Sequence, residues 1–254
     1  IFPSSCSVYG KEGDAHLTEK AKTAPQTPYS LNKIQIEQDL REVSDDSFSP
    51  VILRLATVFG LSPRMRFDVV VNMLTAMAAT SGKIVLNSDG RAWRPHVHID
   101  DVVKAIEHCI LLERVPDSPL VINVGDTNEN FRIIEVAEMV ADQVPGSEIV
   151  FMAGSRSEAA KEDFEFFRDR KVDDGVDKRT YTVSFELIKD KLPGFKCDWT
   201  VEKGIRAMLD TFDEMGLRED QFQSIDFYRL QALESLLDRG LFTENLRWAD
   251  GVAP

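Results

Sequence analysis

The chain has 254 residues, of which 43% are hydrophobic, 29% are charged and 9% are aromatic. This length suffices for one large domain or two modest ones, and the composition is that of a globular protein, which excludes disorder over most of the chain. With 30 Lys and Arg against 43 Asp and Glu, the net charge of −13 argues against nucleic acid as a partner bound through bulk electrostatics.

The apolar stretches and the cysteines bear on membrane insertion and on the cellular compartment. The longest apolar stretch, 51–61, is interrupted by Arg54 and is far shorter than the roughly 20 residues that span a bilayer, so we expect no membrane segment. Three widely spaced cysteines indicate reduced thiols, and we therefore expect a cytoplasmic protein. The chain begins Ile-Phe-Pro without an initiator Met or a signal-type leader, and we expect an upstream segment to be missing.

Strands and helices alternate through the first 150 residues. Apolar, β-branched runs predict strands at 1–5, 50–60, 83–86 and 120–124. Helical spacing predicts helices at 29–43, 67–80, 99–112 and 131–144, the first with Leu31, Ile34, Ile36 and Leu40 as its apolar positions. The run 50–60, bounded by Pro50 and Gly60, is typical of a strand buried on both faces of a parallel sheet. The alternation predicts an α/β fold.

The remainder of the chain is mostly helical by the same criteria. Charged, aperiodic residues predict a loop or linker at 154–178, followed by a strand at 179–184. Helices are predicted at 185–192, 201–215 and 225–239.

A tyrosine and a lysine four residues apart open the first predicted helix. Tyr29 and Lys33 would lie one turn apart on the same face and reach one small-molecule site. A phenol titrates near ~10 in water, so it acts as a base at neutral pH only where nearby cations stabilise the phenolate. Lys33 would supply one such charge, and Ser5, at the end of the adjacent strand, could hydrogen-bond the same substrate oxygen.

Five fragments together resemble a known family. They are SSCSVYG at 4–10, YSLNK at 29–33, RLATVFG at 54–60, WRPHVHIDDV at 93–102 and NVG at 123–125. In this order and spacing they resemble the extended short-chain dehydrogenases/reductases, and within them the NAD-dependent nucleotide-sugar epimerases and dehydratases. The resemblance covers residues 1–150 well and implies an incomplete doubly wound, Rossmann-like parallel sheet with a mostly helical C-terminal substrate-binding region.

The resemblance implies a catalytic group and its cofactor. Tyr29 would be the catalytic acid/base, Lys33 would bind the nicotinamide ribose and favour the phenolate, and Ser5 would contact the reacting hydroxyl. Tyr29 and Lys33 would thus both contact the cofactor, which is expected to be NAD, with NADP left open.

The resemblance also implies a nucleotide-sugar substrate. Arg94 resembles the arginine that grips the substrate diphosphate, a role that suits a planar and permanently charged group. Asn72 resembles a position that contacts the nucleotide sugar, and Arg179 is a candidate for a second phosphate contact. A homodimer is expected, because dimerisation is common in the resembled family.

Departures from the family pattern concern the cofactor and the reaction. The 14 glycines form no Gly-x-x-Gly-x-x-Gly turn, so either an upstream segment or a second polypeptide is expected to complete the sheet, and the strand at 1–5 would be an edge. Cys6 and Ser7 occupy positions where the dehydratases carry acidic residues, which favours epimerisation. A reductase or dehydrogenase, or a non-catalytic nucleotide-sugar-binding module, remains as the alternative.

The resemblance divides the chain into two regions. Residues 1–60 would be the remaining part of the dinucleotide-binding domain, rejoined by strands near 96–125, and residues 61–254 would be mainly the substrate-binding region. His96 and His98 alternate on an extended segment without carboxylate or cysteine at ligand spacing, so we expect core histidines and no metal.

Overall fold

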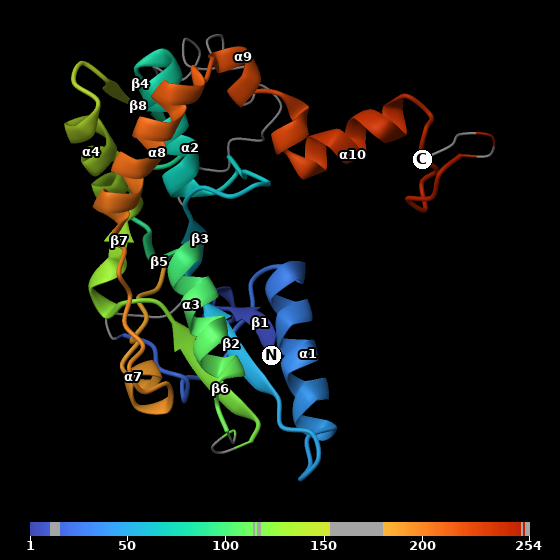
Figure 1. The fold of residues 1–254 in the computed structure, drawn as a ribbon. Coiled ribbons are helices and arrows are strands. Elements are labelled where there is room, and N and C mark those ends of the chain that lie inside the picture. Colours follow the sequence, from blue (N-terminus) through green and yellow to red (C-terminus); the bar gives the residue numbers. More distant parts are fainter. Residues whose placement is uncertain (11–15, 114, 116–117, 153–179, 250, 252–254) are drawn as a thin grey trace.

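The computed structural model describes residues 1–10, 16–113, 115, 118–152, 180–249 and 251 (Figure 1). The strands are β1 (Phe2–Ser5), β2 (Val51–Leu55), β3 (Thr57–Phe59), β4 (Lys83–Leu86), β5 (Trp93–His98), β6 (Leu120–Val124), β7 (Asn130–Arg132) and β8 (Glu148–Phe151). The α-helices are α1 (Pro28–Glu42), α2 (Val70–Ser81), α3 (Ile99–Ile110), α4 (Ile133–Gln143), α7 (Leu187–Lys191), α8 (Val201–Met215), α9 (Glu219–Phe222) and α10 (Arg229–Asp238). Three short 3-10 helices are η1 (Cys6–Tyr9), η2 (Thr127–Glu129) and η3 (Ile225–Phe227).

A parallel sheet in the order β1-β2-β6 forms the first part of the molecule. Alternate residues of β2 face opposite sides: Leu53 packs in the hydrophobic cluster with α3 and α7, whereas Arg54 reaches Glu37 of α1. Helices therefore cover both faces, which confirms the prediction of an incomplete doubly wound α/β fold. β1 pairs only with β2 within the described residues and forms the edge that the sequence predicts.

The strand predicted at 50–60 is two strands in two sheets. Ala56 interrupts it, and the backbone N–H of Ala56 donates to Val124 O at 3.0 Å as the last bond of the first sheet. From Thr57 onward the chain pairs with β5, in a sheet of order β3-β5-β7. The break turns the chain from the parallel sheet towards the second part of the molecule.

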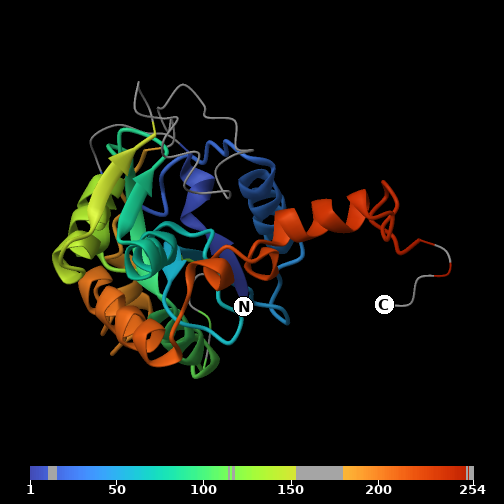
Figure 2. The same ribbon diagram turned by 90° about the horizontal axis from the view of Figure 1, so that it is seen from above.

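The second part of the molecule is built on α2, α4 and α8 with the parallel pair β4-β8 (Figures 1 and 2). α2, α4, α8 and β4 contribute most of a large hydrophobic core that includes Leu74, Met77, Ile84 and Met208. Gly82 ends α2 in the left-handed conformation with φ of 67°, as the sequence predicts. The prediction for 201–215 matches α8 residue for residue.

Two predictions for the C-terminal region are wrong. Residues 180–184 form no strand, because Val183 donates its N–H to the Asn130 side chain and makes only an isolated bridge with Leu17. The helix predicted at 225–239 is divided at Tyr228 into η3 and α10, and α10 leads away from the rest of the molecule (Figures 1 and 2). The loop predicted at 154–178 lies outside the described residues. The division of the chain into two regions at residue 60 stays a prediction.

Two of the four predicted apolar positions of α1 face away from the core, whereas Ile34 is partly buried and packs against the cluster that includes Tyr9. Leu31 and Ile36 are 57% and 39% exposed, whereas Ser30 and Glu37 are buried. Polar side chains therefore attach this helix to the sheet. Among the described helices, none combines the length and apolar character that a bilayer crossing requires.

Candidate active site

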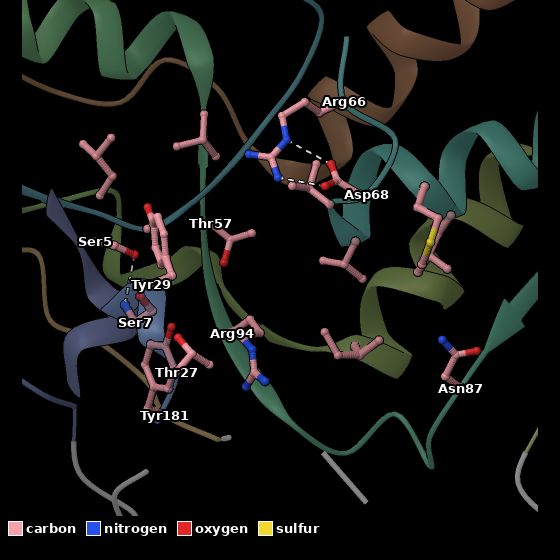
Figure 3. Close-up of a pocket in the computed structure, with 18 of the residues that line it drawn as sticks. Ser5, Ser7, Thr27, Tyr29, Thr57, Arg66, Asp68, Asn87, Arg94 and Tyr181 are labelled. Carbon is pink, nitrogen blue, oxygen red and sulfur yellow. Dashed lines mark hydrogen bonds and ion pairs between the residues drawn. The ribbon is translucent and has the colours of Figure 1, made fainter. Parts of the chain in front are cut away.

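A cavity of about 690 Å³ lies between the two parts of the molecule (Figure 3). Its walls come from the end of β1, the start of α1, β3, the loop before α2, β4 and β5. Of the predicted site residues, Ser5, Tyr29, Lys33 and Arg94 line it, whereas Asn72 does not. Arg179 lies outside the described residues.

The start of α1 brings Tyr29 and Lys33 to the cavity. Thr27 caps the helix through a capping box with Ser30, and Pro28 occupies the first helical position. The Lys33 ammonium lies 5.5 Å from the centre of the Tyr29 ring and donates a 2.7 Å hydrogen bond to Pro3 O. Burial lowers the pKa of Lys33. Tyr29 is 57% exposed, so its phenol is accessible to a ligand.

Ser5 has a local role as well as its place at the cavity. It is the N-cap of η1, and its hydroxyl oxygen accepts a hydrogen bond of 3.2 Å from the Ser7 N–H. The hydroxyl hydrogen is free to point elsewhere, because the Ser7 bond uses only an oxygen lone pair. Ser5 can therefore cap the turn and donate to a ligand at the same time.

Arg94 is buried on the β5 wall of the cavity. Its Nη1 donates to Trp93 O at 2.7 Å, and its guanidinium lies 5.5 Å from the centre of the Tyr181 ring. Tyr181 also lines the cavity. The backbone and the ring hold the guanidinium plane in one orientation, which suits recognition of a phosphate or carboxylate.

Asn72 uses its amide within the protein. Its Oδ1 accepts from Gly60 N at 3.0 Å, and its Nδ2 donates to Arg66 O at 2.9 Å. The side chain is 3% exposed and holds the loop between β3 and α2 at both ends. In the structure Asn72 holds the loop between β3 and α2 in place, and a direct contact with the nucleotide sugar stays a prediction.

Sequence reasoning missed Arg66 and Asp68, which also line the cavity. Arg66 pairs with Asp68 through two hydrogen bonds of 2.9 Å, one from Nε and one from Nη2. The sequence offers only a basic pair at Arg64 and Arg66 in a loop, which carries no periodic signal. Thr57 of β3 lines the cavity too.

A buried polar network attaches α1 to the sheet. The Arg54 guanidinium donates to both carboxylate oxygens of Glu37, at 3.0 and 2.6 Å, and Ser4 donates to the same carboxylate. Arg54 Nη1 also donates to the Tyr9 hydroxyl, which donates to the Asn123 side chain at 2.7 Å. Glu37 follows Lys33 by four residues, so the network fixes the helix face that carries Tyr29 and Lys33.

The two histidines of β5 are buried as expected, and they differ in their hydrogen bonds. His98 accepts from Asp100 N as the cap of α3 and stacks on Trp199 at 4.0 Å. Within the described residues, neither ring nitrogen of His96 has a hydrogen-bond partner, and burial lowers its pKa to about 3. Over the described part of the chain, no group of three or more His, Cys, Asp or Glu is arranged to hold a metal ion.

Solved structures share this fold. The UDP-glucuronic acid 4-epimerase of Bacillus cereus, in complex with UDP-glucuronic acid and NAD, matches with a TM-score of 0.65 and 21% identity over 84% of this chain and 60% of that chain. The dTDP-glucose 4,6-dehydratase of Bacillus anthracis, in complex with NAD, matches with a TM-score of 0.65 and 20% identity over the same shares. These likenesses establish a Rossmann-like fold, the class to which the first part of the molecule belongs.

Sequence comparison finds relatives among the epimerases. The UDP-glucose 4-epimerase of Bacillus subtilis is 26% identical over 175 residues, which are 61% of this chain and 50% of that protein. That of Bifidobacterium longum is 28% identical over 155 residues, 54% of this chain and 45% of that protein. Residues 1–125 match the model of the NAD dependent epimerase/dehydratase family. The chain spans about half the length of these curated relatives.

Proposed function

We propose that the chain carries the catalytic helix and the substrate-binding region of an NAD-dependent enzyme that epimerises a nucleotide sugar by transient oxidation of a sugar hydroxyl. The observation that carries the proposal is the cavity in which an exposed phenol, an ammonium and a serine hydroxyl meet: Tyr29, Lys33 and Ser5. Arg94 supports it with a buried, oriented guanidinium on another wall of the same cavity. The match of residues 1–125 to the NAD dependent epimerase/dehydratase family agrees with this chemistry.

The residues at the start of α1 fit the nicotinamide end of NAD. Lys33 offers an ammonium with N–H groups beyond the one that it gives to Pro3 O, and ribose hydroxyls are suitable acceptors. The hydroxyls of Ser7 and Thr27 line the same wall. Bound NAD supplies a hydride acceptor for the sugar carbon.

The protein's own residues handle the proton. Tyr29 accepts the proton of the reacting sugar hydroxyl as the carbon is oxidised, and it returns that proton when the carbon is reduced from its other face. Lys33, 5.5 Å from the ring, favours the phenolate that performs this step. Ser5 donates a hydrogen bond to the reacting oxygen and orients it. Arg94 binds the diphosphate and so holds the sugar next to Tyr29.

The test is conversion of UDP-glucose to UDP-galactose by the chain with NAD, followed by chromatography. Tyr29→Phe removes the proton acceptor and is expected to lower turnover by about 10²- to 10⁴-fold, with UDP-glucose affinity within about twofold of the parent. Tyr228→Phe, the same change at the start of α10 and outside the cavity, is the matched control and is expected to retain activity.

The same assay separates the rival functions. An epimerase turns over without net change in NADH absorbance, whereas a reductase or dehydrogenase changes it stoichiometrically. Binding of UDP-glucose, followed through tryptophan fluorescence, without NAD binding or turnover would identify a binding module. Equal turnover by the Tyr29→Phe variant would contradict the proposed role of the phenol. A homodimer, cytoplasmic location and a completing segment or polypeptide for the sheet remain proposals.

A further inference from the structure

Three cationic side chains line the cavity, and they lie on different walls. Lys33 is on α1, Arg94 is on β5 and Arg66 is in the loop between β3 and α2, while Asp68 is the one carboxylate among the described lining residues. The proposed function gives Lys33 a ribose and Arg94 a diphosphate. The proposed function assigns no ligand group to Arg66, although cations that line a cavity favour anionic ligands.

Arg66 lies on the side of the cavity where the sugar reacts. Figure 3 shows its guanidinium directed towards the Tyr29 ring, with Thr57 nearby, while Arg94 lies on a separate wall. Hydrogen bonds to Asp68 raise the pKa of Arg66 most, and the charge of the Tyr29 phenolate raises it further, which puts the two groups within electrostatic reach. Because Tyr29 takes the proton of the reacting hydroxyl, a group beside it faces the sugar rather than the nucleotide.

The loop that carries Arg66 is held on both sides of this residue. Asn72 accepts from Gly60 N and donates to Arg66 O, which ties the loop to α2. The next residue, Phe67, is 2% exposed and packs against Phe212 and Phe222, with ring centres at 5.8 and 5.2 Å. The backbone of Arg66 is therefore fixed, and only its side chain extends towards the cavity.

Asp68 orients the guanidinium and leaves part of it available. It accepts from Nε and Nη2, each at 2.9 Å, so it occupies one edge of the planar group. Within the described residues Nη1 donates no hydrogen bond, and its two N–H groups can bind a carboxylate. The side chain is 60% exposed, which keeps it accessible from the cavity mouth.

From these contacts we propose that Arg66 is a specificity-determining residue that binds an acidic substituent on the sugar ring, so that the preferred substrate is a nucleotide sugar of the uronic acid class. The inference rests on the proposed function. Thr57, on the β3 wall beside Arg66, offers a hydroxyl to the same substituent.

The test compares UDP-glucose with UDP-glucuronic acid, which differ only in the hydroxymethyl or carboxylate group at C6. Calorimetric titration of the chain is expected to give about tenfold tighter binding of UDP-glucuronic acid, the effect of one charge-assisted hydrogen bond. Arg66→Met is expected to remove this preference and to leave UDP-glucose affinity within about twofold. Arg64→Met, the same change at an exposed position of the same loop outside the cavity, is expected to keep the preference.

The outcomes separate this inference from the proposed function. Equal affinity for the two sugars, or a preference that survives Arg66→Met, overturns the inference and leaves the proposed function intact. A loss of affinity for both sugars to the same extent overturns it too, because Arg66 would then act on the shared nucleotide. Failure of both compounds to bind overturns the proposed function and this inference with it.

Discussion

His96 makes the stability of the protein depend on pH. Its ring is fully buried, both nitrogens lack a hydrogen-bond partner among the described residues, and burial, aided by the charge of Arg94, lowers its pKa from 6.5 to about 3. Between these values the unfolded chain binds a proton that the folded protein does not, so stability falls as pH falls, by about 1.4 kcal/mol per pH unit. His96→Leu removes this dependence and is expected to gain about 2 to 3 kcal/mol over the parent on going from pH 7.5 to 4.5.

Urea unfolding at the two pH values measures this effect. His16→Gln, at an exposed position, is the control and is expected to follow the pH dependence of the parent. Parallel pH profiles for the parent and His96→Leu would contradict the explanation. His98 is not a suitable site for the same test, because its Nδ1 caps α3 and replacing the side chain would also remove this helix cap.

The amino-acid sequence predicts the place of some cavity residues and not of others. Tyr29 and Lys33 share a cavity wall because four residues are one helical turn, a local relation that the sequence contains. Arg66 reaches the same cavity only through a loop whose course depends on Asn72 and Phe67. The amide of Asn72 is used by backbone groups of that loop, and no local pattern predicts such partners.

At the scale of elements, the buried pair of Glu37 and Arg54 is expected to hold α1 on the sheet. The two side chains are 3% and 5% exposed, so removing one partner leaves a buried charge uncompensated. Arg54→Met or Glu37→Leu is therefore expected to lower the free energy of unfolding by about 3 to 5 kcal/mol. The double variant is expected to lose less than the sum, because neither charge remains buried alone.

A double-mutant cycle by urea unfolding measures this coupling. Arg218→Met, which breaks an exposed pair with Asp220, is the control and is expected to change stability by less than about 1 kcal/mol. Additive losses at Glu37 and Arg54 would show that the pair does not couple α1 to β2.

Elements with a regular apolar or periodic pattern were predictable, and elements without one were not. β4, β6 and α8 have continuous apolar or periodic patterns, and their predicted bounds match. β5 contains Pro95 and two histidines, and β7 has only three residues, so neither gives a strand signal. The polar attachment of α1 was not predictable, because Glu37 becomes a core residue only when Arg54 of a distant strand meets it.

At the scale of the whole molecule, the cavity depends on how two separately packed parts meet. One hydrophobic cluster surrounds α2, α4 and α8, and two others lie around the parallel sheet. The cavity takes Ser5 and Tyr29 from the sheet part and Val70 and Asn87 from the part around α2. The sequence identifies motifs on each part, but the separation between them follows from tertiary packing.

A ligand in this cavity is expected to stabilise both parts together. UDP-glucose at about 100 times its dissociation constant adds about 2.7 kcal/mol to the free energy of unfolding, which for a chain of this size raises Tm by about 5 to 10 °C. Uridine lacks the diphosphate that Arg94 would bind, so at the same concentration it is expected to shift Tm much less. Scanning calorimetry measures both shifts. Because either part must release the ligand before it unfolds, the whole transition should move, and a shift confined to one of two resolved transitions would place the binding site within a single part.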